Sequence, residues 1–573
     1  MNRQEFRELA LGGPIMFDGS TGMELSRRGM PSGICNETWM LKNSDIVLKM
    51  QEDYVKAGAK ILLTPTFVSS RLKLAKYGLA SETNRINIEL SKITKKAAGD
   101  KAYVAAEIGP TGEMIAPMGM ITFQEIYDVF LEQAKALLTI EPDMFIMETF
   151  MSLNEIRAAV LAIRSICDLP IVASMTFEGT STLMGTSAAS AAIALVAAGA
   201  DAVGCNCSSG PGGLAFVLDE MRKVTDVPLF AKPNAGIPQM IKGETVFPLD
   251  PDEFAHECIA LLDSGAHFVG GCCGAGPEHV RQLGEIAKSY KRCKTPRTPL
   301  YICGPRKVLA LTTDMPLTII GERINPTGKK ELAADFVSGG YFTALDMAGD
   351  QLSNGAKILD VNVSAPSVDQ SAMMYTLVEN LSAMAPSPLS IDCPDDKVME
   401  RGLFRFPGKA ILNSITGESH KCEKRLALAA KYGAVPIILP MDDNGLPKTA
   451  DDRMKILDDI LAKGEKYGIN KDNIIVDALI MSIASGSDGM EALRFVTMCR
   501  DKGILTIAGL SNVSFGLPNR TLINNTYLSM LAGAGLNMVI ANPNDDNIIK
   551  TVDSINALRD HDEYCIDYVK KYK

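Results

Sequence analysis

Short apolar runs alternate with helical patterns along the whole chain, and this alternation limits the possible folds more than any other feature. Between the runs, apolar residues recur every three or four positions, as expected for amphipathic helices. Strands that alternate with helices pair in parallel, and eight such units are the number in a closed (β/α)8 barrel. In the first half, the eight runs are 14–18, 59–64, 103–107, 144–148, 170–175, 201–205, 228–232 and 267–271.

The second half of the chain repeats the same count. Its eight runs are 317–322, 357–362, 388–392, 409–413, 435–439, 473–477, 504–510 and 536–541. A doubly wound open sheet is the competing fold, but it rarely gives eight units twice. Residues 289–316 carry lysine, arginine and proline without a sustained period, which is typical of a linker. We therefore predict an α/β protein with two tandem (β/α)8 barrels, in modules 1–288 and 317–573 joined by a linker at 289–316.

Composition excludes several classes of function. A net charge of −10 without a long basic run argues against a nucleic-acid partner. The thirteen cysteines lack small-domain disulfide spacing, so we expect a reducing, cytoplasmic location. The N-terminus has no apolar core segment of a signal peptide, and the alanine-rich window 187–204 is broken by Gly199 and Asp201. We expect no membrane partner.

Three cysteines stand where barrel strands end. Cys207 follows the sixth run, and Cys272 and Cys273 close the eighth, with glycines on both sides of the pair. Active sites of such barrels are built at the carboxyl ends of the strands, so the three thiols are expected to converge. A buried or accidental pair is the simpler interpretation of Cys272–Cys273 taken alone. Together, three thiolates favour a zinc site with a fourth position open for substrate.

Acids and amides gather at the strand ends of the second half. Helix capping explains some of them, since Asp and Asn are common at strand-to-helix turns. Acids or amides at seven of the eight strand ends are more than capping predicts. A barrel mouth lined by these side chains fits a flat heterocycle with amide-like edges. The set is Glu322, Asn325, Asp360, Asn362, Asp392, Asn413, Asp477, Asn512 and Asn542.

The chain resembles the N-terminal half of cobalamin-dependent methionine synthases, a homocysteine-binding barrel followed by a methyltetrahydrofolate-binding barrel. The resemblance covers nearly the whole chain in order. The stretches that carry it are Asp18-Gly19-Ser20-Thr21-Gly22, Ile108-Gly109-Pro110-Thr111-Gly112, Glu148-Thr149-Phe150, Gly204 to Cys207, Pro233-Asn234-Ala235-Gly236, Gly270 to Gly274, Ile320-Gly321-Glu322-Arg323-Ile324-Asn325-Pro326, Leu359-Asp360-Val361-Asn362 and Gly509-Leu510-Ser511-Asn512-Val513-Ser514-Phe515-Gly516-Leu517-Pro518.

The resemblance implies roles for individual residues. It implies that Cys207, Cys272 and Cys273 hold Zn²⁺ and that the homocysteine thiolate takes the fourth position. Contacts to homocysteine are implied for Asp18, Gly19, Glu148 and Asn234. Pterin contacts are implied for Glu322, Asn325, Asp360, Asn362, Asp392, Asn413, Asp477, Asn512 and Arg520, with Asn512 and Asp477 as the catalytic pair near the methyl-bearing nitrogen.

Three positions depart from the family pattern. Pro65 stands where Asn is usual, Met23 where Thr is usual, and Ala478 where proline commonly follows the acid. These departures affect loops around both substrates and leave the cysteines and the Asp/Asn set intact.

The resemblance implies a methyltransferase of methionine biosynthesis. Methyltetrahydrofolate would be the methyl donor, and methylcobalamin, on a separate corrinoid protein or a missing domain, would carry the methyl group. We expect such a carrier because no histidine here has the Asp-x-His-x-x-Gly context of cobalamin-binding domains. Two alternatives stay open: a corrinoid/folate methyltransferase of an anaerobic demethylation pathway, and a non-catalytic binding protein with degenerate barrels.

Overall fold

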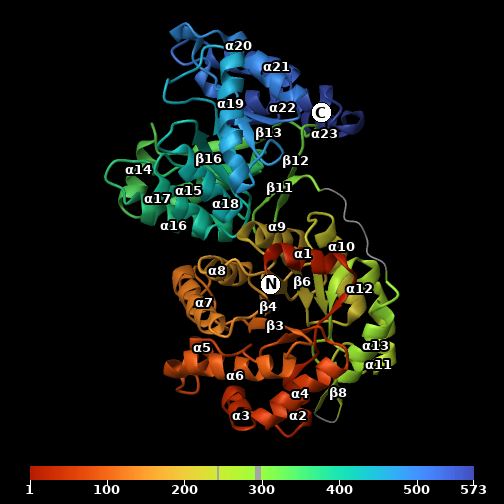
Figure 1. The fold of residues 1–573 in the computed structure, drawn as a ribbon. Helices are drawn as coiled ribbons and strands as arrows, with labels where there is room; N and C mark the ends of the chain where they lie inside the picture. The colour runs from red at the N-terminus through yellow and green to blue at the C-terminus, as the bar shows by residue number, and fades with distance from the viewer. Residues whose placement is uncertain (242–243, 291–297) are drawn as a thin grey trace. The chain divides into compact units, whose positions relative to one another are not determined.

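A computed structural model describes residues 1–241, 244–290 and 298–573. The chain divides into two compact units, Met1–Thr298 and Pro299–Lys573. Each unit holds eight parallel strands with helices around them (Figure 1). The predicted fold class, two tandem (β/α)8 barrels, is therefore confirmed. The predicted module limits 1–288 and 317–573 stay a prediction, and residues 291–297 of the predicted linker lie outside the described residues.

The first unit is an eight-stranded parallel sheet whose ends meet. Its order is β1-β10-β7-β6-β5-β4-β3-β2, and a bridge between Phe17 and Ile61 joins the outer strands. The amide of Asp18 also donates to the carbonyl of Ile61 at 3.2 Å, which completes the barrel. The strands are β1 (Ile15–Met16), β2 (Ile61–Leu63), β3 (Tyr103–Ile108), β4 (Met144–Phe150), β5 (Ile171–Met175), β6 (Ala202–Asn206), β7 (Leu229–Lys232) and β10 (Ala266–Val269), with a hairpin of β8 (Gln239–Ile241) and β9 (Glu244–Val246).

Helices of the first unit begin at polar caps. Thr122 and Glu125 form a capping box at the start of α7, and Ser187 caps α9, so that backbone N–H groups of the first turn are satisfied. The helices are α1 (Arg3–Leu11), α2 (Thr21–Arg27), α3 (Asn36–Lys42), α4 (Ser44–Lys56), α5 (Arg71–Ala75), α6 (Thr83–Ala98), α7 (Phe123–Leu138), α8 (Leu153–Arg164), α9 (Ala188–Ala198), α10 (Pro211–Arg222), α11 (Pro251–Glu257), α12 (Ile259–Asp263) and α13 (Pro277–Ala287).

Aromatic side chains fill the amino-terminal end of the first barrel. Phe6 of α1 stacks on Phe268 of β10 with ring centroids 4.9 Å apart, and Phe17 meets Phe230 edge to face at 5.0 Å. All four side chains are buried in one core cluster. Each such burial stabilises the fold by about 2 kcal/mol. This packing gives that end of the barrel an apolar core.

The second unit is a closed barrel in chain order. The last strand returns to the first through the parallel pair Thr318 and Met538. Its strands are β13 (Thr318–Ile324), β14 (Ile358–Val361), β15 (Leu389–Asp392), β16 (Ile411–Thr416), β17 (Val435–Leu439), β18 (Ile475–Asp477), β19 (Leu505–Gly509) and β20 (Met538–Ala541). The helices are α14 (Lys330–Val337), α15 (Phe342–Ser353), α16 (Gln370–Met384), α17 (Asp396–Arg405), α18 (Cys422–Tyr432), α19 (Ala450–Gly464), α20 (Gly489–Asp501), α21 (Arg520–Ala534), α22 (Asp546–Leu558) and α23 (Ile566–Tyr572).

A hairpin that the sequence did not suggest precedes the second barrel. It joins β11 (Leu300–Cys303) to β12 (Val308–Leu311) in antiparallel pairing. Ile302 and Leu311 are buried with Ile320 and Ile358 of the barrel strands, so the hairpin covers the amino-terminal end of that barrel. Part of the segment expected to be a linker is thus ordered core. Among the described residues, no helix combines the length and hydropathy that crossing a membrane requires.

Candidate active sites at the mouth of each barrel

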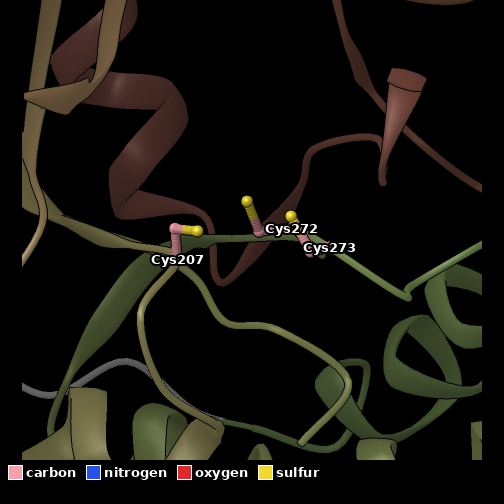
Figure 2. Close-up of side chains that lie close together, drawn as sticks. All are labelled: Cys207, Cys272 and Cys273. Atoms are coloured by element: carbon pink, nitrogen blue, oxygen red, sulfur yellow. The ribbon is translucent and has the colours of Figure 1, made fainter. Parts of the chain in front are cut away.

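The three cysteines singled out in the sequence converge at the mouth of the first barrel. Cys207 comes directly after β6, while Cys272 and Cys273 follow β10, and their sulfur atoms all lie within 4.8 Å of one another. In Figure 2, Cys207 reaches from its own segment toward the adjacent pair. Cys207 has a left-handed backbone with φ of 62°, which turns its side chain out of the strand direction. Cys207 and the pair Cys272–Cys273 are therefore far apart in the sequence but close together in space.

Glycines make the close backbone approach at this mouth possible. A Cβ on Gly19 would come within 2.8 Å of the Tyr54 ring and nearer still to the carbonyl oxygen of Ala275. A Cβ on Gly271 would clash with the Ala275 side chain in the same way. Gly19 thus lets the loop after β1 lie against the loop that carries Cys272 and Cys273. Its predicted role as a homocysteine contact stays a prediction.

The electrostatics of the cysteine cluster favour a single thiolate when no cation is bound. Hydrogen bonds from Cys272 and Cys273 lower the pKa of the Cys207 thiol to about 3. The same hydrogen bonding to Cys207 raises the pKa of Cys272 well above its ordinary value and that of Cys273 to about 11. The negative charge of the Cys207 thiolate therefore opposes ionisation of Cys272 and Cys273. A bound divalent cation removes this opposition, because a coordinated thiol loses its proton.

Two asparagines hold the cysteine loops in place. The Asn234 side-chain oxygen accepts from the backbone N–H of Cys273 at 3.1 Å. Asn206 donates to the sulfur of Cys272 at 3.9 Å and to Thr149 at 2.7 Å. Asn234 therefore supports a cysteine loop, and its predicted contact to substrate stays a prediction. The sequence reasoning missed Asn206, because its position inside β6 looks like an ordinary strand residue.

Cys205, near the end of β6, lies outside the cluster. It is fully buried, and its thiol points to the carbonyl of Leu214 at 3.7 Å. Burial raises the pKa of this thiol, so it stays protonated.

A cavity of about 430 Å³ opens beside the three thiols. Its charged lining is Glu37, Glu107, Glu148 and Lys232. Gly19 and Pro65, in the loops after β1 and β2, and Met23, in α2, also line it. Lys232 is buried at the end of β7, with its ammonium nitrogen 3.5 Å from Asp18 and 3.3 Å from Glu148. The cavity is thus an acidic pocket with one internal cation. Two of the three positions that depart from the family pattern line it.

Burial and charge shift the protonation of this cluster. Burial raises the pKa of Asp18 to about 6, although Lys232 and a hydrogen bond from the Leu63 amide act against it. Burial opposes the charge of Lys232, but Glu148 and Asp18 outweigh this effect and raise its pKa. Lys232 therefore stays cationic. The sequence offered one signal for it, a lysine at the carboxyl end of an otherwise apolar strand.

The second barrel brings together a set of four predicted residues, which form two hydrogen-bonded pairs. The Asn362 amide donates to Asp392 at 2.9 Å, and the Asn413 amide donates to Asp360 at 3.2 Å. Ser390 donates to the same oxygen of Asp360 at 2.6 Å. Asp360 lies in β14, Asp392 in β15 and Asn413 in β16, which are neighbours in the sheet, and Asn362 directly follows β14. Their oxygens and amides present both acceptors and donors to the mouth.

The two aspartates of this set resist ionisation. Burial, and then the charge of Asp392, raises the pKa of Asp360 to about 8. Burial also raises the pKa of Asp392, against a hydrogen bond from Asn362 and the nearby Arg425. Arg425 donates to the carbonyls of Cys393 and Pro394 and so fixes the loop after Asp392. Nothing in the sequence distinguished Arg425, which lies in the middle of α18.

Other predicted residues of the second barrel lie apart from this set. Asp477 accepts from the Leu479 amide at 2.7 Å, and burial raises its pKa to about 6. Glu322 accepts from Ser511 at 3.4 Å, and burial raises its pKa. Arg520, the first residue of α21, donates to the Ser511 carbonyl at 2.8 Å and thus contacts the residue that donates to Glu322.

Of two further predicted residues, Asn325 stabilises a turn and Asn512 is exposed to solvent. Asn325 accepts from the Thr327 amide at 3.0 Å, which is the hydrogen bond of a turn. Asn512 is exposed at the end of the short helix Leu510–Asn512 that follows β19. The structure thus collects Asp360, Asn362, Asp392 and Asn413, and it leaves Asn325 and Asn512 on the surrounding loops.

Comparison with known proteins assigns a family to each barrel. Residues 15–287 match the family model of homocysteine S-methyltransferase, and residues 321–542 match that of pterin binding enzymes. Each barrel therefore matches one family model, and the two models follow each other along the chain. The predicted enzyme class and the predicted resemblance are confirmed.

The curated relatives are longer than this chain. The methionine synthases of Mycobacterium leprae (strain TN) and Mycobacterium tuberculosis (strain ATCC 25618 / H37Rv) are each 28% identical to it, over 571 and 565 residues. The match covers 92% of this chain and 47% of each relative, so the chain spans about half their length. A solved structure, the metallated form of the homocysteine methyltransferase MmuM from Escherichia coli, is 20% identical with a TM-score of 0.42, covering 48% of this chain and 96% of that one.

Proposed function

We propose that the methyltransferase makes methionine by methylating homocysteine, with methyltetrahydrofolate as the donor and a corrinoid as the carrier between them. The observation that carries the proposal is the convergence of Cys207, Cys272 and Cys273 beside an acidic cavity. The first module, 1–288, would bind homocysteine, and the second, 317–573, would bind the pterin.

The donor set in the first barrel fits zinc. Three sulfur ligands are typical of a borderline metal, and three protein ligands leave one position for a substrate. Cys207, Cys272 and Cys273 would hold the ion, and Asn206 and Asn234 would orient two of them. When bound, zinc would keep the homocysteine thiol as a thiolate at neutral pH. The thiolate sulfur would then take the methyl group from the carrier and form a thioether, and the electron pair of the broken carrier–methyl bond would stay with the carrier.

The protein's own residues prepare the thiol site. Asn234 holds the backbone at Cys273, and Asn206 holds Cys272, so the three sulfurs are preorganised. Lys232 offsets the charge of Asp18 and Glu148 behind the cavity. Apolar residues of the cavity wall, such as Met23 and Phe67, limit water near the sulfurs. Preorganisation of this kind lowers the cost of reaching the reactive geometry.

In the second barrel, the set Asp360, Asn362, Asp392 and Asn413 would bind the pterin ring. A pterin presents N–H donors and ring acceptors along one edge, which pair with carboxylates and carboxamides. Loss of a methyl group from N5 needs that nitrogen to be protonated or strongly hydrogen-bonded. Asn512 and Asp477 are proposed to act there, because Asn512 is open to ligand and Asp477 has a pKa of about 6.

We also propose a cytoplasmic location, which the free thiols of the described cysteines favour. A non-catalytic binding protein is disfavoured because both polar sets are assembled. Titration calorimetry of the whole chain with homocysteine and with methyltetrahydrofolate tests the function. We expect both to bind, with Cys273→Ser abolishing only the first and Asp392→Asn weakening only the second. Failure of the wild-type chain to bind either ligand would refute the proposal.

A further inference from the structure

His279 stands in the first turn of α13, shortly after Cys273, and its imidazole ring uses both nitrogens. Nδ1 accepts from the Gly276 amide at 3.3 Å, and Nε2 lies 3.2 Å from the carbonyl oxygen of Leu249. Burial lowers the pKa of His279, so the ring is neutral at neutral pH. Because Nδ1 is the acceptor, the ring proton is on Nε2, which therefore donates to Leu249.

These two hydrogen bonds close a ring of contacts that begins at Cys273. The carbonyl of Cys273 accepts from the Ala235 amide at 2.9 Å, and the carbonyl of Ala235 accepts from the Leu249 amide at 3.1 Å. The carbonyl of Leu249 then accepts from His279, whose ring accepts from Gly276. Gly276 leads back along the chain to Cys273. The chain after β7 is thereby joined to the chain after β10.

The chain after β7 also holds the backbone of both neighbouring cysteines. The Cys272 amide donates to the carbonyl of Pro233 at 2.7 Å, and the Cys273 amide donates to the side chain of Asn234 at 3.1 Å. The position of this cysteine pair therefore depends on where the chain after β7 lies.

Two further contacts of the His279 ring help to define its role. The ring meets that of Phe254, a fully buried residue of α11, edge to face with centroids 5.4 Å apart. His279 is also the third residue of α13, and its bond from the Gly276 amide is that of a helix cap. A cap needs Nδ1 alone, whereas the bond from Nε2 goes to a different segment of the chain. Capping of α13 therefore does not explain the whole arrangement.

We propose that His279 is a positioning residue for the cysteine pair, because its bond to Leu249 holds the chain after β7 against the chain after β10. The consequence for the metal rests on the proposed function, which places zinc at the three cysteines. Sulfur atoms from two separate segments reach one ion only if those segments keep a fixed separation. Loss of an outer-shell partner typically lowers metal affinity about 10–100-fold.

Two conservative variants separate the two hydrogen bonds of the ring. In His279→Asn, the side-chain oxygen can still accept from Gly276, but the side chain is too short to reach Leu249. In His279→Gln, the amide nitrogen lies near the place of Nε2 and can still donate to Leu249. Competition with a chelator measures the zinc affinity of the whole chain. We expect a loss of about tenfold in His279→Ala and His279→Asn, and of less than about threefold in His279→Gln.

Hydrogen exchange of the metal-free chain gives a readout that does not depend on zinc. Peptides covering 233–236 and 272–276 should exchange faster in His279→Ala and His279→Asn, and at the wild-type rate in His279→Gln. His256→Asn and His256→Gln, at an exposed histidine of α11, are the matched controls and should equal the wild type in both measurements. The fluorescence of Trp39 during urea unfolding shows whether each variant retains the fold of this unit.

The pattern across the variants decides the matter. Wild-type zinc affinity and wild-type exchange in His279→Ala would overturn the inference. Recovery in His279→Asn but not in His279→Gln would show that the ring only caps α13, which would overturn it as well. If the wild-type chain bound no zinc, the proposed function would fail. Exchange of the two peptides would then still decide whether His279 holds the two segments together.

Discussion

The ammonium nitrogen of Lys232 lies 3.3 Å from a carboxylate oxygen of Glu148, inside the first barrel where neither side chain is more than 8% exposed. A buried ion pair is costly to assemble, since both charges leave water. Here the pair extends to Asp18, and it stands at the floor of the substrate cavity. The charges of Lys232, Glu148 and Asp18 are therefore expected to affect both the cavity and the stability of the first barrel.

We predict that Lys232→Met destabilises the first unit by about 3–5 kcal/mol, because it leaves two buried carboxylates without a countercharge. The single tryptophan, Trp39, lies in that unit, so its fluorescence during urea unfolding reports the change. Lys223→Met, at an exposed lysine paired with Glu220, should have little effect. Equal unfolding midpoints for Lys232→Met and the wild type would show that the ion pairs contribute nothing.

The second prediction concerns metal content. We expect one zinc per chain, and each of Cys207→Ser, Cys272→Ser and Cys273→Ser should lose most of it, because two remaining sulfurs cannot hold the ion as tightly. Elemental analysis after dialysis measures this. Cys565→Ser, at an exposed cysteine outside the cluster, is the control and should keep its zinc. Full occupancy in all three variants would remove these residues from the metal site.

The third prediction concerns the second barrel. Asp392→Asn or Asn413→Ala should weaken methyltetrahydrofolate binding by about 1–3 kcal/mol for each lost hydrogen bond to a buried ligand edge. Homocysteine binding and zinc content should not change, since those sites lie in the other unit. Calorimetry measures both affinities on the same sample. If pterin affinity were unchanged in both variants, neither residue would belong to the pterin site.

Much of both sites followed from the sequence because a barrel has a strict periodicity. Once Cys207 was placed after the sixth strand and Cys272 after the eighth, the topology required them to share a mouth. The same reasoning grouped Asp360, Asp392 and Asn413, which lie on three neighbouring strands. Position in the repeat, rather than residue type, carried these predictions.

Pairings across the barrel could not be read from the sequence. Lys232 pairs with Asp18 and Glu148, which lie 214 and 84 residues away in the sequence. Periodicity gives no information on which acids a lysine neutralises. The hairpin before the second barrel was also missed, because each strand has four residues and the segment is rich in proline and basic residues. Short elements of this kind are stabilised by tertiary burial, which a local pattern does not report.

The fourth prediction is a pH dependence that originates at Asp360. Its pKa is raised from 3.8 to about 8, mainly by burial and then by Asp392. At a pH between these two pKa values, Asp360 keeps its proton in the folded protein and loses it in the unfolded chain. The contribution to the unfolding free energy is therefore complete below about pH 4 and is lost as the pH rises through 8. At 1.36 kcal/mol per pKa unit, the loss is on the order of a few kcal/mol.

Asp360→Asn should flatten this dependence, since the amide keeps the shape and cannot ionise. Hydrogen exchange of the β14 and β15 peptides, measured by mass spectrometry at pH 5, 6.5 and 8 with correction for intrinsic rates, follows the second barrel alone. Asp459→Asn, at an exposed aspartate of α19, is the control and should retain the wild-type slope. A wild-type slope in Asp360→Asn would show that another group is responsible.

The last prediction is that methionine formation by this methyltransferase requires a corrinoid. The thiol site and the pterin site belong to separate, complete barrels, whereas reacting atoms must approach to about 3–3.5 Å. A carrier that visits each mouth in turn meets that requirement. The assay combines the chain, homocysteine and methyltetrahydrofolate, first without cobalamin and then with methylcobalamin or a corrinoid protein. We expect methionine only in the second case, with Cys273→Ser inactive in both, and turnover without any corrinoid would rule the carrier mechanism out.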